Sequence, residues 1–323
     1  MKKIEEITRI NGGDVKSLNK ELLRLVKSDD EQLNEILDFV FDAKGKQVRA
    51  HMVYLSAGIF GKANSKTQLA AILVQLLHTS TLIHDDVVDE AELRRGRSTV
   101  NAIWKNKIAI LTGDYMFARA LSIATERKAY DLLEILTPTI SEMSIGEIIQ
   151  MQEIGNNKFS ESVYYDIIYR KTAVLISASA QAGALSSGAG ESEQMAMKEL
   201  GKAAGMAFQI QDDILDFTAN GSFGKTRGKD IEEKKYTLPL IHALDKAPEN
   251  EKKMVMEMIN KGVNKKEIRE IIRFIETYQG FDYAREKMQA YVDRAHEILK
   301  QFPQNKANSA MSELLKYFTQ RKK

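Results

Sequence analysis

Residues 68–89 read QLAAILVQLLHTSTLIHDDVVD. The apolar side chains in this stretch recur every three or four residues, which is the spacing of one face of an α-helix. The same spacing returns in five further stretches of the chain: 132–151, 163–185, 200–215, 254–275 and 284–302. Turn-forming residues collect between the stretches and separate them. The sequence therefore predicts a chain that is helical over nearly its whole length.

Composition supports an all-α fold. The chain has 323 residues but only 4 Pro and 19 Gly, so residues that break helices are few. No linker is long enough to divide the chain, and we expect one domain over residues 1–323. The 47 basic and 45 acidic residues nearly balance, which disfavours disorder and nucleic acid as a partner. The absence of Cys excludes disulfides, thiolate zinc sites and cysteine nucleophiles.

The start of the chain has early acidic residues and no apolar core, so it does not resemble a signal or transit peptide. No window of 18 uncharged apolar residues occurs that would span a membrane. We expect a soluble, cytoplasmic protein.

Two aspartate triplets point to the chemistry. Residues 85–89 read DDVVD and residues 212–216 read DDILD. On a helix, each triplet gathers three carboxylates on one narrow face, where like charges repel. Bound cations would relieve that repulsion, and carboxylate oxygens without nearby His or Cys suit Mg²⁺. Two solvated acidic faces are the plain alternative, and the occurrence of two such triplets in one chain argues against it.

Basic residues accompany the triplets along the chain. A diphosphate needs such a set, because metal ions bridge some of its oxygens while guanidinium and ammonium groups bind the rest. Each basic residue alone is more often an ordinary surface charge. The candidates are Lys46, Arg49, Arg94, Arg95, Lys171, Lys225 and Lys235.

At these residues the sequence resembles the all-trans polyprenyl diphosphate synthases, octaprenyl-type long-chain enzymes among them. The family's motifs occur in the family's order: HDDVVD at 84–89, RRG at 94–96, GEIIQ at 146–150, KTA at 171–173, FQIQDDILD at 208–216, GK at 224–225 and TLP at 237–239. They cover roughly residues 45–244. The resemblance implies the all-α isoprenoid synthase fold, with ten or more helices around a deep central cavity. It also implies a homodimer and condensation of isopentenyl diphosphate with an allylic diphosphate such as farnesyl or geranylgeranyl diphosphate.

The chain departs from the family near residue 45. The family usually has Gly-Gly-Lys-Arg-x-Arg-Pro, whereas residues 44–50 read KGKQVRA. The two cations expected to bind isopentenyl diphosphate, Lys46 and Arg49, are kept. The departure bears on the rigidity of the loop and on the Michaelis constant for isopentenyl diphosphate, not on the class of reaction.

The resemblance also implies a role for each matching residue. Asp85, Asp89 and Asp212 would be the main ligands of Mg²⁺, of which three ions would bind with the diphosphate, and Asp86, Asp213 and Asp216 would be weaker partners. Arg94, Lys171, Lys235 and Lys225 would hold the allylic diphosphate, and Lys46, Arg49, His78 and Arg95 the isopentenyl diphosphate. Gln150 is a further candidate for substrate binding, and the carbonyl of Lys171, with Thr172 and Gln209, would face the allylic cation. For His78, Thr172 and Gln150, an ordinary buried polar side chain is the plain alternative.

Small side chains precede the first triplet and bear on product length. Ser80 and Thr81 lie about one helical turn upstream of Asp85, and one turn rises ~5.4 Å, close to one extended isoprene unit. Short-chain members of the family carry bulky aromatic residues at this level. We therefore expect a product of about C30–C50, centred on C40, with Leu77 one turn deeper.

Three alternatives remain open. A short-chain synthase would make C15 or C20 products, and the lack of aromatic residues at 80 and 81 disfavours it. A terpene cyclase or head-to-head synthase would not need Lys46, Arg49 and Arg95. A non-catalytic or partner-dependent subunit of a hetero-oligomeric synthase is the third. A long product is insoluble, so its release at a bilayer surface by transient contact is plausible, although no strong amphipathic anchor is evident.

Overall fold

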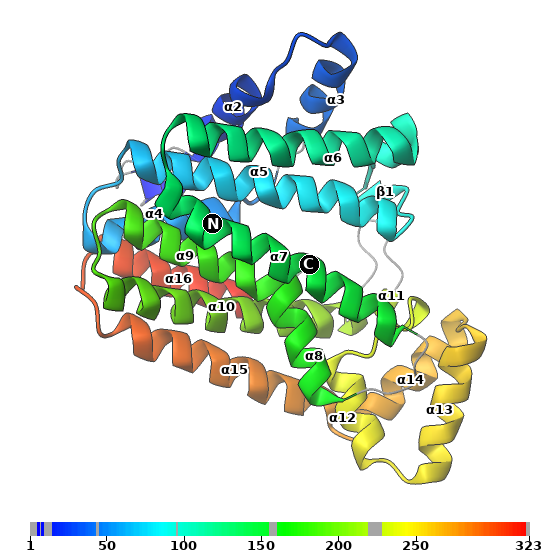
Figure 1. The fold of residues 1–323 in the computed structure, drawn as a ribbon. Coiled ribbons are helices and arrows are strands. Elements are labelled where there is room, and N and C mark those ends of the chain that lie inside the picture. Colours follow the sequence, from blue (N-terminus) through cyan, green and yellow to red (C-terminus); the bar gives the residue numbers. More distant parts are fainter. Residues whose placement is uncertain are drawn as a thin grey trace. The chain divides into compact units, whose positions relative to one another are not determined.

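The computed structural model describes residues 5–6, 8–9, 15–42, 45–94, 96–154, 160–218 and 228–320. Within these ranges the regular structure is helical apart from one hairpin of two-residue strands, β1 (Leu93–Arg94) and β2 (Arg97–Ser98). More than ten helices occur there (Figure 1). The prediction of an all-α fold is therefore confirmed. Lys44, Arg95 and Lys225 lie outside the described residues.

The chain divides into two compact units, and each unit is built from three separate stretches. Unit 1 comprises Met1–Ile140, Ala178–Lys198 and Leu299–Leu314. Unit 2 comprises Ser141–Ser177, Glu199–Ile298 and Leu315–Lys323. The first aspartate triplet belongs to unit 1 and the second to unit 2. The single domain expected over residues 1–323 stays a prediction.

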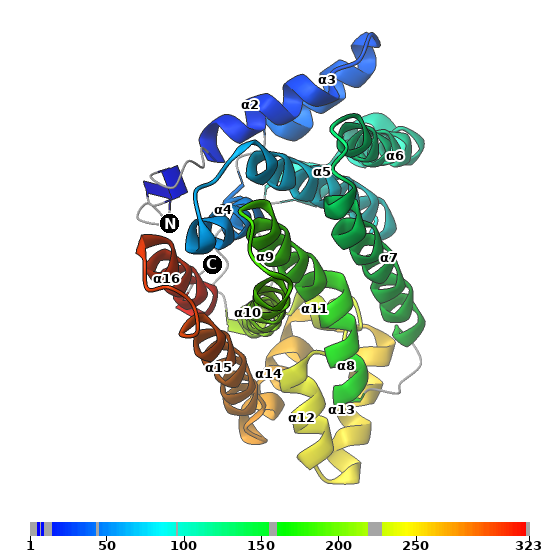
Figure 2. The same cartoon turned by 60° about the vertical axis from the view of Figure 1, so that its left-hand side comes forward.

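Unit 1 is built on two long helices, α5 and α6, that pack along each other, with the pair α2 and α3 against them (Figures 1 and 2). Helix α4 is buried on every side from Ala50 to Ile59, a stretch in which nearly all side chains are apolar. The helices that lie wholly in this unit are α2 (Val15–Val26), α3 (Glu31–Phe41), α4 (Val48–Phe60), α5 (Ser65–Val88) and α6 (Val100–Glu126).

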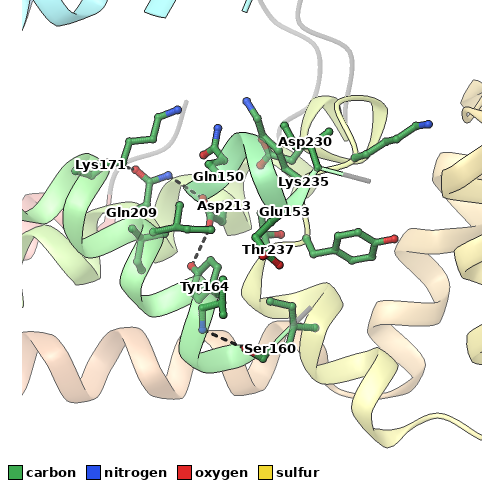
Figure 3. A pocket seen from close by; sticks show the side chains of 18 residues that line it. Gln150, Glu153, Ser160, Tyr164, Lys171, Gln209, Asp213, Asp230, Lys235 and Thr237 are labelled. Atoms are coloured by element: carbon green, nitrogen blue, oxygen red, sulfur yellow. Dashed lines mark hydrogen bonds between the residues drawn. The ribbon is translucent and has the colours of Figure 1, made fainter. Parts of the chain in front are cut away.

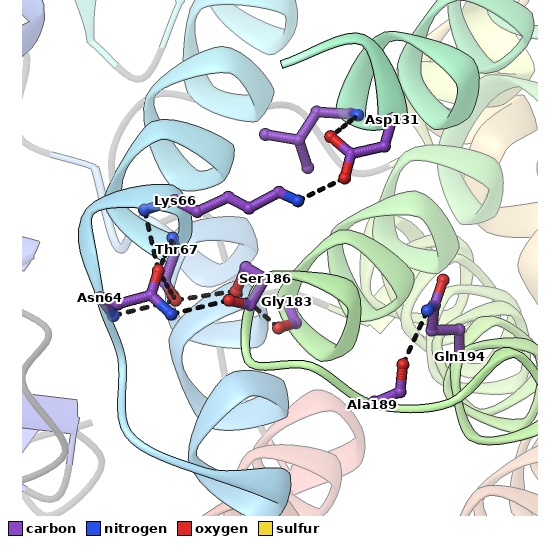
Figure 4. Close-up of polar contacts among 9 residues, drawn as sticks. Asn64, Lys66, Thr67, Asp131, Gly183, Ser186, Ala189 and Gln194 are labelled. Atoms are coloured by element: carbon purple, nitrogen blue, oxygen red, sulfur yellow. Dashed lines mark hydrogen bonds and ion pairs between the residues drawn. The ribbon is translucent and has the colours of Figure 1, made fainter. Parts of the chain in front are cut away.

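A polar cluster secures the start of α5 within unit 1 (Figure 4). The side chain of Asn64 caps the helix by accepting from the backbone N–H groups of Lys66 and Thr67. Its amide also donates to the carbonyl of Ser186 at 2.7 Å, and the hydroxyls of Thr67 and Ser186 lie 2.7 Å apart. Lys66 pairs with Asp131. These contacts hold the helix that carries the first aspartate triplet at its other end.

Unit 2 contains shorter helices, with α12 packed on both α8 and α14. Helix α8 runs directly into a π-helical turn, η1, inside the stretch for which the sequence predicted unbroken helix. The elements that lie wholly in this unit or reach its edge are α8 (Glu161–Ile168), η1 (Tyr169–Ala173), α11 (Lys229–Glu232), α12 (Leu238–Lys246), α13 (Glu249–Lys261), α14 (Lys265–Thr277) and α15 (Gly280–Leu299). Helices α7 (Tyr130–Glu153), α9 (Val174–Ser186), α10 (Glu191–Thr218) and α16 (Lys306–Gln320) contribute residues to both units.

The prediction of one continuous helix over residues 254–275 is wrong. The apolar spacing over residues 254–275 continues through a break, because α13 ends at Lys261 and α14 begins at Lys265. Gly262 takes a positive φ of 88°, which suits glycine. The side chain of Asn264 caps α14, and the carboxylate of Glu267 accepts in return from the backbone N–H of Asn264. Periodicity alone does not detect a break that keeps the helical spacing in register.

None of the helices in the described ranges combines the length and the apolar composition needed to cross a lipid bilayer.

Candidate active site

The first triplet ends helix α5 and separates into one buried and two accessible carboxylates. Asp86 is only 7% exposed, and its carboxylate accepts a 2.6 Å hydrogen bond from Nε of Arg94 on β1. Asp85 is half-buried, and Asp89, which caps the helix, is exposed. Residues four apart on a helix differ by about 40° in direction, whereas neighbours differ by about 100°. Turning Asp86 inward therefore leaves Asp85 and Asp89 together on the accessible face.

His84, directly before this triplet, fastens α5 to α6 within unit 1. Its Nε2 lies 3.2 Å from the carbonyl oxygen of Ile110 and 3.3 Å from a carboxylate oxygen of Asp114. The ring lies against Gly113, where an added Cβ would be 2.3 Å from Nε2. The close approach thus depends on the missing side chain at Gly113, and it fixes the backbone next to Asp85.

The second triplet, on α10, repeats the division into buried and accessible carboxylates. Asp213 is 5% exposed and accepts two hydrogen bonds, from the hydroxyl of Tyr164 at 2.7 Å and from the amide of Gln209 at 2.8 Å (Figure 3). The oxygen of Gln209 accepts in turn from the hydroxyl of Thr172 at 2.8 Å. Asp212 is half-buried.

Asp216 is half-buried and ties the end of α10 to the segment that follows the triplet. Its carboxylate accepts from the backbone N–H of Asp230 at 3.1 Å. Its carbonyl accepts from the backbone N–H of Gly228, also at 3.1 Å. These two bonds hold the start of α11 next to the triplet.

Burial strongly affects the acidity of this cluster. Burial raises the pKa of Asp213 well above its usual value, and the nearby charge of Asp230 adds to the increase. Hydrogen bonds from Tyr164 and Gln209 oppose the increase in pKa because they favour the ionised form. Burial, together with the charge of Asp213, also raises the pKa of Tyr164. Tyr164 is therefore a neutral donor to Asp213.

Of the cations predicted to bind the allylic diphosphate, those in the described residues, Arg94, Lys171 and Lys235, are each paired with an acidic side chain. Lys171, on η1, lies 2.6 Å from a carboxylate oxygen of Glu147. Lys235 lies 2.6 Å from Glu233, which Lys229 also contacts at 2.8 Å. The two lysines lower the pKa of Glu233 although its burial acts in the opposite direction. These carboxylates orient the ammonium groups, and an anionic ligand would compete with them.

A pocket in unit 2 brings many of the predicted residues together (Figure 3). Its volume is about 860 Å³ including its open mouth. The predicted site residues that line it are Gln150, Lys171, Thr172, Gln209, Asp213 and Lys235. Its apolar lining includes Val163, Ile167 and Ile168 of α8 and Ile241 of α12. The amide of Gln150 makes a long contact, 3.5 Å, with Glu147.

Two of the residues predicted for isopentenyl diphosphate meet in unit 1. Nη1 of Arg49 lies 2.9 Å from Nε2 of His78. Lys46 is exposed just before α4. Gln47, which stands where the family usually has Arg, takes a left-handed conformation with φ 43° and donates to Asn19. The altered motif therefore still presents Arg49 on the first turn of α4.

The residues predicted to set product length lie on α5. Ser80 is 1% exposed and Leu77 is 2% exposed, whereas Thr81 is half-buried. The hydroxyl of Ser80 donates to the carbonyl of Leu77, and that of Thr81 donates to the carbonyl of His78. Both hydroxyls are therefore satisfied within their own helix.

The accessible carboxylates suit a hard divalent cation. They offer only oxygen donors, which Mg²⁺ prefers. No three His, Asp or Glu side chains in the described ranges converge on one point as a complete set of ligands. Mg²⁺ usually binds one or two carboxylates and takes its other ligands from water and substrate phosphates. The pair Asp85 and Asp89 fits that mode of binding.

Sequence reasoning missed the partners that hold these residues. Tyr164 carries no signal that separates it from its neighbour Tyr165, because both lie in one helical stretch. Glu147 lies inside a recognised motif, but its pairing with Lys171 depends on η1. Glu233 lies only two residues before Lys235, but its side chain meets that of Lys235 because the chain turns after α11.

Comparisons with known proteins agree with the geometry. The polyprenyl synthetase family profile matches residues 30–275. Octaprenyl diphosphate synthase of Haemophilus influenzae is 30% identical, over 96% of this chain and 95% of its own. Heptaprenyl diphosphate synthase component 2 of Bacillus subtilis is 36% identical, over 96% of this chain and 88% of its own.

A solved structure extends the similarity to the fold. The crystal structure of a decaprenyl diphosphate synthase from Rhodobacter capsulatus matches with a TM-score of 0.93 and 30% identity, over 99% of each chain. Geranylgeranyl diphosphate synthases match as well. The chain therefore belongs to the polyprenyl synthetase family, and it is a prenyltransferase.

Proposed function

We propose that the chain joins isopentenyl diphosphate head-to-tail to an allylic diphosphate, farnesyl or geranylgeranyl diphosphate, and releases a medium- or long-chain trans-polyprenyl diphosphate. One observation carries the proposal. In each triplet the middle carboxylate is buried and bonded, at Asp86 and Asp213, and the other two reach an accessible face. Such an arrangement turns two carboxylates of each triplet toward a face that cations bound to a diphosphate could reach.

Residues from both units would contribute to ionisation of the allylic substrate. Lys171 and Lys235, with Arg94 and Lys225, would bind the diphosphate as it leaves and stabilise its developing charge. Mg²⁺ held by Asp85, Asp89 and Asp212, three ions in all, would neutralise the diphosphate oxygens. The carbonyl of Lys171, with Thr172 and Gln209, would offer negative dipole ends to the allylic cation.

Isopentenyl diphosphate would be held by Lys46, Arg49, His78 and Arg95. The contact between Arg49 and His78 supports this assignment, because it places two such groups side by side. The double bond would attack C1 of the allylic cation, forming the new carbon–carbon bond. The attack would leave a positive charge on the inner carbon of the former double bond. Loss of a proton from the carbon next to it would form the new double bond, and a diphosphate oxygen would accept that proton, as the resemblance implies. The two units would act together as one catalytic domain over residues 1–323.

For product length we propose C30–C50, with C40 as the centre. The support is the absence of a bulky side chain at Ser80 and Thr81. A short-chain synthase making C15 or C20 is the second candidate, since geranylgeranyl diphosphate synthases are among the similar proteins.

The proposal includes a homodimer working in the cytoplasm, with transient membrane contact for release of the product. Exposed apolar side chains on α6 support self-association: Ile103 is 44%, Ile110 43% and Leu111 62% exposed. A small partner is the alternative, because the Bacillus subtilis relative is named as component 2 of its synthase. Light scattering of the purified chain distinguishes a dimer from a monomer.

Product analysis tests the function. The purified chain is incubated with labelled isopentenyl diphosphate, farnesyl diphosphate and Mg²⁺, and the dephosphorylated products are sized by chromatography. We expect a ladder that ends at C30 or longer and disappears with EDTA. Products that stop at C15 or C20 would leave the reaction in place and contradict the proposed length. A folded chain that forms no product would favour the partner-dependent subunit.

A further inference from the structure

Asp213 is held from two directions within unit 2. One donor, Gln209, lies one turn earlier on the same helix, α10, so it turns together with Asp213. The other donor, the hydroxyl of Tyr164, belongs to α8. Of the two donors, only Tyr164 joins the Asp213 side chain directly to another helix.

The orientation of Asp213 determines where the other two carboxylates point. Asp212 and Asp216 lie about 40° apart around the helix axis, and Asp213 is about 60° to 100° away from them. A rotation of α10 that released Asp213 from Tyr164 would turn Asp212 and Asp216 away from their present half-exposed positions. The single bond from α8 thus bears on both accessible carboxylates.

A second bond joins the same elements further along. Thr172, on η1, donates to Gln209, on α10. Thr172 lies eight residues after Tyr164, and Gln209 lies four residues before Asp213. Tyr164 and Thr172 therefore form two bridges from one continuous segment to α10. Lys171 lies on that segment next to Thr172. The two bridges keep Lys171 and the triplet in a constant register.

The ring of Tyr164 has a separate role from its hydroxyl. The ring packs in the core cluster that contains Ile168, Ile210 and Ile214. Phenylalanine would keep this packing and remove only the hydrogen bond. The contribution of the bond can therefore be measured apart from that of the core.

We propose that Tyr164 is a positioning residue for the second aspartate triplet: its hydroxyl holds the carboxylate of Asp213 and thereby orients Asp212 and Asp216 toward Mg²⁺ and diphosphate. The inference rests on the proposed function of the triplet. It assigns to Tyr164 no contact with substrate or metal. Its effect passes entirely through Asp213.

The experiment compares Tyr164→Phe with a matched control, Tyr165→Phe, in the full-length chain. Tyr165 is the next residue, is half-buried and bonds through its hydroxyl to Glu161 instead. We expect Tyr164→Phe to raise the Mg²⁺ concentration for half-maximal activity ~10-fold, the lower end of the range for loss of a residue that orients a metal ligand. The control should stay within about twofold of the unmodified chain, the scatter common between mutant measurements.

A second readout does not depend on turnover. Mg²⁺ with inorganic diphosphate should raise the thermal unfolding midpoint of the unmodified chain and of Tyr165→Phe, because a ligand of the folded state stabilises it. The increase should be clearly smaller for Tyr164→Phe at the same concentrations. If Tyr164 had only a structural role, Tyr164→Phe would lower the thermal unfolding midpoint measured without ligand. The Mg²⁺ dependence of activity and the increase in midpoint caused by Mg²⁺ with diphosphate would both be unchanged.

A double-mutant cycle completes the test. In an Asp213→Asn background, Tyr164→Phe should change the Mg²⁺ response no further, because its route is already removed. An equal change in that background, or equal Mg²⁺ responses of the two Tyr→Phe variants, would overturn the proposal. If Tyr164→Phe alone fails to fold, Asp213→Asn by itself must show the increased Mg²⁺ requirement, because the effect of Tyr164 passes through Asp213; an unchanged requirement would overturn the proposal. An unmodified chain that responds to neither Mg²⁺ nor diphosphate would instead contradict the proposed function.

Discussion

The imidazole ring of His84 lies so close to Gly113 that a Cβ on Gly113 would be 2.3 Å from Nε2. His84 directly precedes Asp85, and its ring also contacts Ile110 and Asp114 on α6. The position of the first aspartate triplet therefore depends on a glycine 24 residues after its last member, Asp89.

Gly113→Ala should lower both the thermal midpoint and the activity at limiting Mg²⁺. Alanine by itself would stabilise a helix by about 1 kcal/mol relative to glycine, so a decrease reveals the clash with His84. Calorimetry and Mg²⁺ titration of activity measure the two effects. The double variant Gly113→Ala/His84→Ala should recover stability relative to Gly113→Ala. No recovery would show that the ring of His84 is not what the added methyl group meets.

Gly146→Ala should impair use of the allylic diphosphate. A Cβ at Gly146 would lie 2.6 Å from Cβ of Arg170 and 3.0 Å from the backbone nitrogen of Lys171. The methyl group would displace η1 and with it Lys171. A displacement of up to about 1 Å lowers kcat/KM roughly 10- to 100-fold. Steady-state kinetics with varied allylic diphosphate measures it. At Gly190 the nearest heavy atom to an added Cβ is 3.6 Å away, so Gly190→Ala is the control and should leave the kinetics unchanged.

Thr81→Tyr should shorten the product. Thr81 is half-buried, so a larger side chain has room there, whereas Ser80→Phe at a fully buried position would add an overpacking cost of about 1–3 kcal/mol. We expect the product ladder to end at C15 or C20. Thr79→Tyr places the same ring on nearly the opposite face of α5 and should leave the ladder unchanged. A ladder that is the same for Thr81→Tyr and the unmodified chain would refute this use of the position.

His51 should make the fold sensitive to acid. Its ring is 1% exposed, contacts the hydroxyl of Thr8 at 2.9 Å, and burial lowers its pKa to about 4. Since the unfolded chain binds the proton near pH 6.5, the stabilisation is complete above that pH. It is lost as pH falls toward 4, up to about 3 kcal/mol. Unfolding in denaturant at several pH values should show a flatter acid limb for His51→Gln, and no such flattening for His296→Gln.

Part of this molecule could be predicted from sequence because helical spacing and spaced carboxylates are local signals. Residues 68–89 indicate a helix by their apolar period, and the i,i+4 spacing of Asp85 and Asp89 puts both on one face. Which carboxylate turns inward depends on a partner elsewhere: Arg94 for Asp86 and Tyr164 for Asp213. No local pattern records such a partner.

The π-helical turn η1 could not be predicted from the sequence either. Residues 163–185 keep a helical period through Tyr169–Ala173, so the apolar spacing does not reveal the wider turn, which packs closely on neighbouring helices. Gly146 and Gly205 allow that packing, since an added Cβ at Gly205 would lie 2.5 Å from Cα of Ala173. The pairing of Lys171 with Glu147 follows from this turn and was missed with it.

The hydroxyls of Ser80 and Thr81 both donate to carbonyls of their own helix, so neither position requires a polar neighbour from another element. Alanine or valine could replace either residue without stranding a donor or an acceptor. At half-buried Thr81, side-chain volume can therefore change in single steps at little cost to the fold. Side-chain volume on this helix can thus change during evolution while the aspartate triplet at its end stays the same. Such changes would allow related enzymes to differ in product length.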